Sequence, residues 1–242
     1  MKTPNTCVIA FCGPDGTGKS TIANLLSITL SKSGYLTKRI WIKNVHLISY
    51  FIVSALETLN KNCVLRSSSG AVITSCIANN HTLWTWFESF NIVLKTIYFI
   101  LLKGFYRLLN KKLVFIADRF ILDSMVHVLI SVLFLKFGFK DKKIVMLKLV
   151  ESFPYKVLRS LSAKYSVVIL LDGKEEVLIE RKKKTQKHDP YWYLKLQRIL
   201  YRVIARTLSI DVYYIDTTKK SIHEVYLEVL NAIKEVLKDE EK

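Results

Sequence analysis

The segment that most constrains this chain is rich in glycine and reads Gly-Pro-Asp-Gly-Thr-Gly-Lys-Ser over residues 13–20. It follows an apolar run, residues 6–12, and precedes a stretch with helical periodicity. Glycines allow successive backbone N–H groups to turn inward around phosphate oxygens, and the helix that follows presents its positive end to them. The segment therefore predicts a phosphate-binding loop in a nucleotide-binding protein.

The residue types within this loop suggest separate roles. We expect Lys19 to meet the β- and γ-phosphates of a nucleotide and Ser20 to hold Mg²⁺. Asp15 is unusual, because polyphosphate repels a carboxylate. It either faces a hydroxyl donor such as a sugar, or it faces solvent or a local backbone N–H. The expected nucleotide-binding residues are Gly13, Pro14, Asp15, Gly16, Thr17, Gly18, Lys19, Ser20 and Thr21.

The rest of the chain alternates short apolar runs with longer helical patterns. The runs cover residues 6–12, 38–43, 112–117, 166–172 and 212–216. Runs of continuous apolar residues are typical of central strands in a parallel sheet, and the alternation predicts helices on both faces of that sheet. The sequence thus predicts an α/β fold in a single domain, residues 1–242.

The helical patterns vary in how clearly they are bounded. Residues 44–59 and 82–109 have helical length with few polar positions, which favours buried helices. Residues 60–80 contain a Ser and Gly cluster without a clear period and predict an irregular connection. The last pattern, residues 221–238, starts with Ser221 and Glu224, the spacing of a capping box.

A second group of polar residues follows the third apolar run. Asp118 and Arg119 lie where that strand should end, so the pair should approach the phosphate loop at the carboxyl edge of the sheet. Asp118 could orient Mg²⁺ through water, and Arg119 could bind phosphate by two parallel hydrogen bonds. The alternatives are a surface ion pair or a helix start capped by Asp123.

A basic segment follows the fourth run and includes Arg181, Lys182, Lys183 and Lys184. Cations beside a phosphoryl-transfer site can neutralise the charge that spreads over the transferred group, and residues 181–190 could form a lid. A solvated helix end is the alternative. We expect Arg181 to be the most important cation of this segment.

Composition limits the partners and the compartment. Lys and Arg number 37 against 20 Asp and Glu, a formal charge of +17, which attracts nucleotide phosphates, nucleic acid or acidic lipid. No nucleic-acid-binding signature and no apolar run long enough to span a membrane occurs. The four cysteines show no CxxC spacing, and the first residues resemble no secretory signal, so we expect a cytoplasmic protein.

Taken together, FCGPDGTGKST, ADRFILDS, LLDGKEEVLIERKKK and VYYIDTTKKSIHEVYLEVL resemble the thymidylate kinases and their relatives among P-loop nucleoside monophosphate kinases. The resemblance implies a three-layer P-loop NTPase fold, a five-stranded parallel sheet, a small lid and often a homodimer. It also implies Mg-ATP as donor and dTMP as acceptor, giving dTDP. In such enzymes Asp15 would approach the deoxyribose, Asp118 the metal, Arg119 the acceptor phosphate, and Arg181 the transferred group.

Parts of the family pattern are absent. Residues 43–46 read Lys-Asn-Val-His where the family commonly has Arg-Glu-Pro, and no Arg occurs between Ile77 and Lys103. His127 and Val128 replace a frequent Tyr-Gln pair. Two alternatives therefore stay open: a P-loop kinase for another small acceptor, and a non-catalytic ATP-binding module whose basic surface binds a partner.

Overall fold

The computed structural model describes residues 6–41, 48–59, 64–66, 72–74, 81–108, 113–119, 121–136, 167–184, 191–207 and 212–239. The strands in these ranges are β1 (Thr6–Cys12), β2 (Leu36–Ile40), β3 (Val64–Arg66), β4 (Val72–Thr74), β5 (Leu113–Asp118), β6 (Val167–Asp172) and β7 (Val212–Asp216). The helices are α1 (Lys19–Lys32), α2 (Ile48–Leu59), α3 (His81–Leu108), α4 (Ile121–Lys136), α7 (Glu175–Lys183), α8 (Tyr191–Thr207) and α9 (Ile222–Asp239).

The central element is a five-stranded sheet in the order β2-β5-β1-β6-β7. Every neighbouring pair of strands is parallel. From β1 the chain builds the sheet first on the side of β5 and β2 and later on the side of β6 and β7, so the order reverses at β1. In sheets of this kind ligands bind beyond the carboxyl end of the strands at such a reversal.

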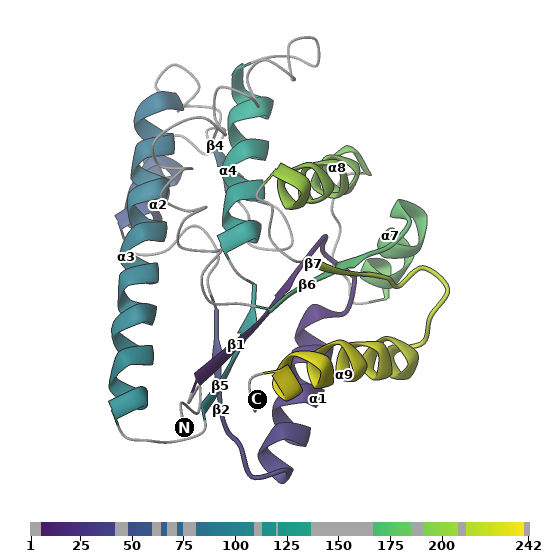
Figure 1. Ribbon diagram of the computed structural model, residues 1–242. Coiled ribbons are helices and arrows are strands. Elements are labelled where there is room, and N and C mark those ends of the chain that lie inside the picture. Colours follow the sequence, from purple (N-terminus) through teal and green to yellow (C-terminus); the bar gives the residue numbers. More distant parts are fainter. Residues whose placement is uncertain are drawn as a thin grey trace.

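Helices cover both faces of the sheet (Figure 1). One core layer joins β1, β5 and β6 to α1 and α9, and the other joins the same strands to α4 and α8. On the second face, Phe99 of α3 packs edge-on against Phe115 of β5. The predicted three-layer α/β fold with a five-stranded parallel sheet is confirmed.

The strand and helix predictions were accurate at the centre of the sheet and less so at its edge. The run predicted at residues 38–43 forms β2 from Leu36 to Ile40, with Leu36 opposite Leu113 of β5. As an edge strand, β2 has one neighbour, and none of its side chains is fully buried. The predicted irregular connection at 60–80 contains the antiparallel pair β3–β4.

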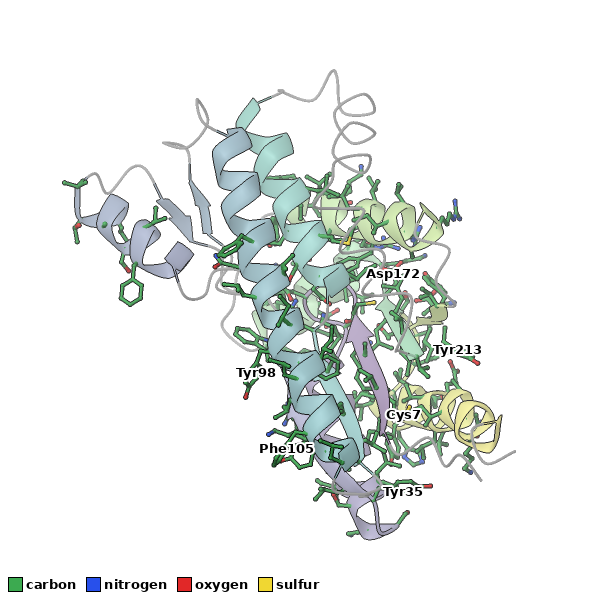
Figure 2. The ribbon with its side chains drawn as sticks, turned by 60° about the vertical axis from the view of Figure 1, so that its left-hand side comes forward. Cys7, Tyr35, Tyr98, Phe105, Asp172 and Tyr213 are labelled. Atoms are coloured by element: carbon green, nitrogen blue, oxygen red, sulfur yellow. The ribbon has the colours of Figure 1, made fainter. Side chains whose placement is uncertain are left out.

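The long helical patterns form α2 and α3, but the predicted burial is wrong for α2, none of whose described side chains is buried, and for one face of α3. Tyr98 and Leu101 are 66% and 68% exposed, and Phe105 is 58% exposed. Figure 2 shows Tyr98 and Phe105 on the same outer side of α3. None of the helices within the described ranges combines the length and the apolar character that crossing a bilayer requires.

The start of α9 agrees with the sequence analysis. The N–H of Ser221 donates to the Glu224 carboxylate over 2.7 Å, and the N–H of Glu224 donates to Ser221 Oγ over 3.3 Å, which is a capping box.

Cys7 and Cys12 lie in β1 as buried free thiols. The other two cysteines, Cys63 and Cys76, lie outside the described residues.

Candidate functional site: a phosphate-binding loop under helix α8

The loop between β1 and α1 has a backbone that requires glycine. Gly13 has φ +134°, and a Cβ there would lie 2.0 Å from the carbonyl oxygen of Leu171 in β6. Gly16 has φ +92°, and a Cβ there would meet the backbone of Leu178 in α7 at 3.1 Å. The loop is therefore wedged between β6 and α7 in a left-handed conformation that L side chains rarely adopt.

The polar side chains of the loop are partly turned inward. The ammonium group of Lys19 donates to the carbonyl oxygens of Gly13 and Pro14 over 2.7 and 2.6 Å. Thr17 Oγ1 also donates to the Pro14 carbonyl, over 2.9 Å. These internal bonds keep the Lys19 ammonium folded over the loop, where arriving phosphate oxygens can take the place of the carbonyl acceptors.

The start of α1 provides an exposed polar end. Gly18, in the left-handed conformation, is the residue that precedes the helix, and no side chain caps it. Ser20 and Thr21 are exposed in the first turn, and no acidic residue lies there. A helix N-terminus of this kind offers unpaired N–H groups and a partial positive charge to an anion.

Asp15 is buried and surrounded by cations. Its side chain forms a close ion pair with the Arg119 guanidinium and lies 4.0 Å from both the Lys19 and the Lys182 ammonium groups. Its backbone N–H donates to the Gln197 side chain over 3.2 Å. The alternative that Asp15 faces solvent is therefore wrong, because the residue is 4% exposed.

Arg119 follows β5 directly and lies next to the loop, as the sequence predicted. Its backbone N–H donates to the Phe11 carbonyl over 3.1 Å, and its φ of 88° is a left-handed value that side chains rarely adopt. Burial by itself would lower the pKa of Arg119, but the carboxylates of Asp15 and Asp123 outweigh it and raise the pKa above its ordinary value. The guanidinium is thus a permanent cation at this edge.

Asp118 ends β5 and is also nearly buried. Arg39 of β2 donates to Asp118 Oδ2 over 3.2 Å, while Asp118 Oδ1 is buried and has no hydrogen-bond partner among the described residues. A buried carboxylate oxygen without a donor fits an acceptor for a metal-bound water. Together with the exposed Ser20 hydroxyl, it supplies the hard oxygen ligands that Mg²⁺ prefers, so these residues fit the ion.

The side chains of the basic segment after β6 contact two different parts of the structure. Arg181 donates to Thr217 Oγ1 over 3.1 Å and to the Thr217 carbonyl over 2.7 Å, which ties α7 to the segment after β7. Lys182 instead is buried against the phosphate loop beside Asp15. Residues 185–190 of the expected lid lie outside the described residues.

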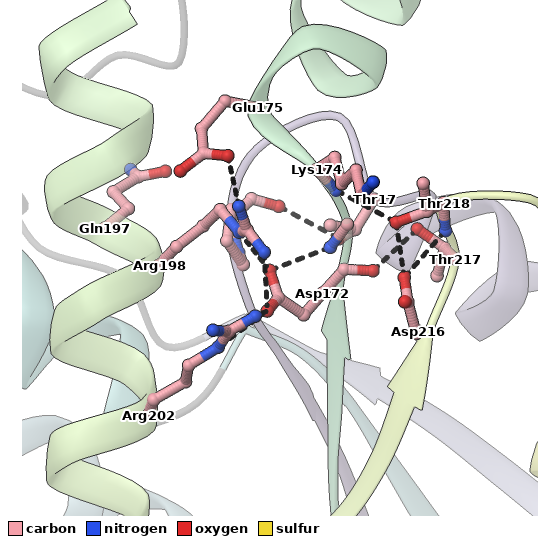
Figure 3. Close-up of polar contacts among 12 residues, drawn as sticks. Thr17, Asp172, Lys174, Glu175, Gln197, Arg198, Arg202, Asp216, Thr217 and Thr218 are labelled. Carbon is pink, nitrogen blue, oxygen red and sulfur yellow. Dashed lines mark hydrogen bonds and ion pairs between the residues drawn. The ribbon is translucent and has the colours of Figure 1, made fainter.

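Sequence reasoning missed a carboxylate that organises the edge next to the loop. Asp172, at the end of β6, is 1% exposed and accepts hydrogen bonds from Arg198 Nε over 2.8 Å and Arg202 Nε over 3.0 Å (Figure 3). Tyr214 of β7 donates to it over 2.9 Å. Burial alone would raise the pKa of Asp172, but the bonds from Arg198 and Arg202 outweigh it and lower the pKa.

Helix α8 supplies most of the polar side chains that the sequence analysis did not identify. Gln197 and Arg198 lie one turn before Tyr201 and Arg202 in this helix. The Gln197 side chain contacts the phosphate loop, and the Tyr201 side chain contacts α4. Both arginines contact β6. The signal that could have found them is the pair of positions with polar groups, 197–198, which recurs one turn later at 201–202 in the helical pattern.

The phosphate loop after the central strand, the sheet order and the acidic and basic pair at the end of β5 define a P-loop NTPase fold. No protein-family model matches the chain, and no curated protein matches it. Solved structures do align with it.

One of these structures is a deoxyadenosine kinase from M. mycoides with bound dCTP, 14% identical over 94% of this chain and 99% of that chain, with a TM-score of 0.49. Another is the YorR protein from Bacillus subtilis in complex with phosphorylated GDP, 16% identical over 94% of this chain and 95% of that chain, with a TM-score of 0.48. At these identities the likeness identifies no substrate for this chain.

Proposed function

We propose that this protein is an ATP-dependent phosphotransferase that moves the γ-phosphoryl group to a small phosphorylated acceptor, with dTMP, giving dTDP, as the first candidate. The observation that carries the proposal is the direct ion pair between Arg119 at the end of β5 and Asp15 in the phosphate loop. It brings a largely shielded arginine next to a loop suited to a nucleoside triphosphate, which is an arrangement that a two-substrate phosphoryl transfer can use.

The donor half of the site would bind the triphosphate of ATP. The N–H groups of residues 13–20 and the start of α1 would surround the phosphates, and Lys19 would exchange its carbonyl acceptors for β- and γ-phosphate oxygens. Ser20 and Asp118 would hold Mg²⁺. That ion would neutralise negative charge on the phosphate groups.

The acceptor half would use Arg119, and the transferred group would lie between the two halves. Arg119 would bind the acceptor phosphate, and Arg181 and Lys182 of α7 would supply positive charge to the transferred group. A transfer of this type needs no covalent intermediate, because positioning and electrostatic stabilisation provide most of the rate.

The acceptor is tested by measuring ADP release from Mg-ATP with purified protein and one acceptor at a time. The panel contains dTMP, dUMP, UMP, CMP, AMP and GMP, and the unphosphorylated nucleosides thymidine and deoxyadenosine. Turnover confined to dTMP supports the proposal. Turnover only with another compound supports a kinase for that acceptor. ATP binding without turnover, together with salt-dependent nucleic acid binding, supports the non-catalytic alternative.

The exposed face of α3 supports a further part of the proposal, that two copies of the chain associate. Its members share one side of the helix and are large and apolar: Phe90, Leu94, Ile97, Tyr98, Leu101, Phe105 and Leu108. Side chains exposed to this degree would each bury roughly 100 Å². Two copies together would approach the area of about 1,200–2,000 Å² that specific interfaces bury.

A further inference from the structure

Both the backbone conformation of Arg119 and two carboxylates from other parts of the chain fix its position. A residue other than glycine at φ 88° carries backbone strain, which persists only where the surroundings fix the conformation. Its side chain is 15% exposed, and each of the two terminal nitrogens of the guanidinium lies beside a carboxylate. Asp15 of the loop forms one contact, and Asp123 of α4 lies 3.6 Å from Nη1 and forms the other.

The second carboxylate is itself held from a distant helix. Asp123 is 2% exposed, and its Oδ1, the oxygen that faces Arg119, accepts a hydrogen bond from the hydroxyl of Tyr201 over 2.6 Å. Tyr201 lies in α8 and is also 2% exposed. Because one oxygen meets both groups, the orientation of the Tyr201 hydroxyl sets the direction from which Asp123 holds the guanidinium.

We propose that Tyr201 and Asp123 are positioning residues that fix the Arg119 guanidinium for an anionic acceptor group, and that α8 thereby controls the acceptor half of the site. This inference rests on the proposed function for its kinetic consequence. Gln197, one turn earlier in α8, accepts a hydrogen bond from the backbone N–H of Asp15, so the same helix also contacts the backbone of the other residue that pairs with Arg119.

A purely structural role for Tyr201 makes a different prediction. The tyrosine belongs to the core layer under α4 and α8, so loss of packing would reduce the folded fraction, which lowers the apparent kcat and leaves the KM values of both substrates unchanged. A positioning role raises the KM for the acceptor and leaves the KM for ATP unchanged, because ATP would bind through the loop backbone, Lys19 and the start of α1 rather than through Arg119.

The test uses Tyr201→Phe, which keeps the ring in the core and removes only the hydroxyl. We expect the KM for the acceptor to rise about 10-fold, the KM for ATP to stay within twofold, and Asp123→Asn to produce the same pattern. The control is Tyr226→Phe, which removes a hydroxyl bonded to Thr29 between α9 and α1. Unchanged KM values, or an equal change in both, for Tyr201→Phe would overturn the inference.

A second measurement does not depend on turnover. In ¹⁵N NMR spectra of the whole protein, a guanidinium fixed by two carboxylates exchanges its protons slowly and gives resolved signals, which Arg119→Lys assigns. We expect Tyr201→Phe to broaden or shift these signals and Tyr226→Phe to leave them unchanged. Unchanged Arg119 signals in Tyr201→Phe would overturn the inference, even where the acceptor panel gives no turnover and the proposed function itself has failed.

Discussion

The ammonium group of Lys182 in α7 lies 4.0 Å from Oδ2 of Asp15 in the phosphate loop. Both residues are buried, at 5% and 4% exposure. This relationship links the basic segment after β6 to the donor half of the site, and it leads to the first prediction.

Replacing Lys182 by Ala should lower kcat by roughly 10²-fold, because a preorganised cation beside the transferred group is lost. The measurement is steady-state ADP release with saturating ATP and acceptor. Lys183→Ala is the matched control, since the neighbouring Lys183 is exposed in the same turn of α7. Equal rates for the two variants would contradict the role of Lys182.

Replacing Arg181 tests the role that the family resemblance assigns to its guanidinium, which is to supply positive charge to the transferred group. We expect Arg181→Ala to lower the rate by about 10³-fold, as for a transition-state arginine. The guanidinium would then have to leave Thr217, to which it now donates. An unchanged rate combined with a lower melting temperature would mean that Arg181 only joins α7 to the segment after β7.

Asp172 should make the stability of the protein sensitive to acid. Its folded-state pKa is lowered, so the stability it contributes is present above the unfolded pKa of about 4 and is lost as the pH falls through the folded value. Asp172→Asn should cost about 1–3 kcal/mol at pH 7 and flatten the decline in acid. Urea unfolding between pH 7 and pH 3 measures this.

The control for the acid experiment is Glu180→Gln, which removes the exposed carboxylate that pairs with Lys184 on the surface of α7. Exposed pairs of this kind contribute little to stability. If the free energy of unfolding falls with pH in Asp172→Asn as steeply as in Glu180→Gln and the unmodified protein, Asp172 does not cause the acid sensitivity.

The outer face of α3 should control self-association. Leu101→Glu places a charge at the centre of the exposed apolar face and should convert a dimer to a monomer. Leu227→Glu makes the same change at an exposed position of α9 and should leave the dimer intact. Sedimentation velocity distinguishes the two. A monomer for the unmodified protein at micromolar concentration would contradict the proposed dimer.

The central strands could be predicted from sequence because burial on both faces leaves a continuous apolar run, as in β6 and β5, whose side chains are all buried. The edge strand β2 has no buried side chain and carries the basic residues Lys38 and Arg39, so its bounds were predicted less well. The place of the loop between β1 and α1 was predicted best, because its left-handed backbone requires glycines at fixed positions.

The contacts that organise the candidate site could not be predicted in the same way. Tyr201 and Asp123 are 78 residues apart in sequence, and Gln197 and Asp15 are 182 apart. Only the fold brings such pairs together, and a single sequence carries no signal of their distance. The left-handed backbone of Arg119 also has no sequence signal, since a residue other than glycine occupies the position.

The most direct test of the account is acceptor-dependent ADP release by the unmodified protein and by Lys19→Ala. We predict turnover with dTMP that requires Mg²⁺ and falls by at least about 10³-fold in Lys19→Ala, because the ammonium group that meets the transferred phosphates is gone. No ADP release with any acceptor, or an equal rate in both proteins, would contradict phosphoryl transfer at this loop.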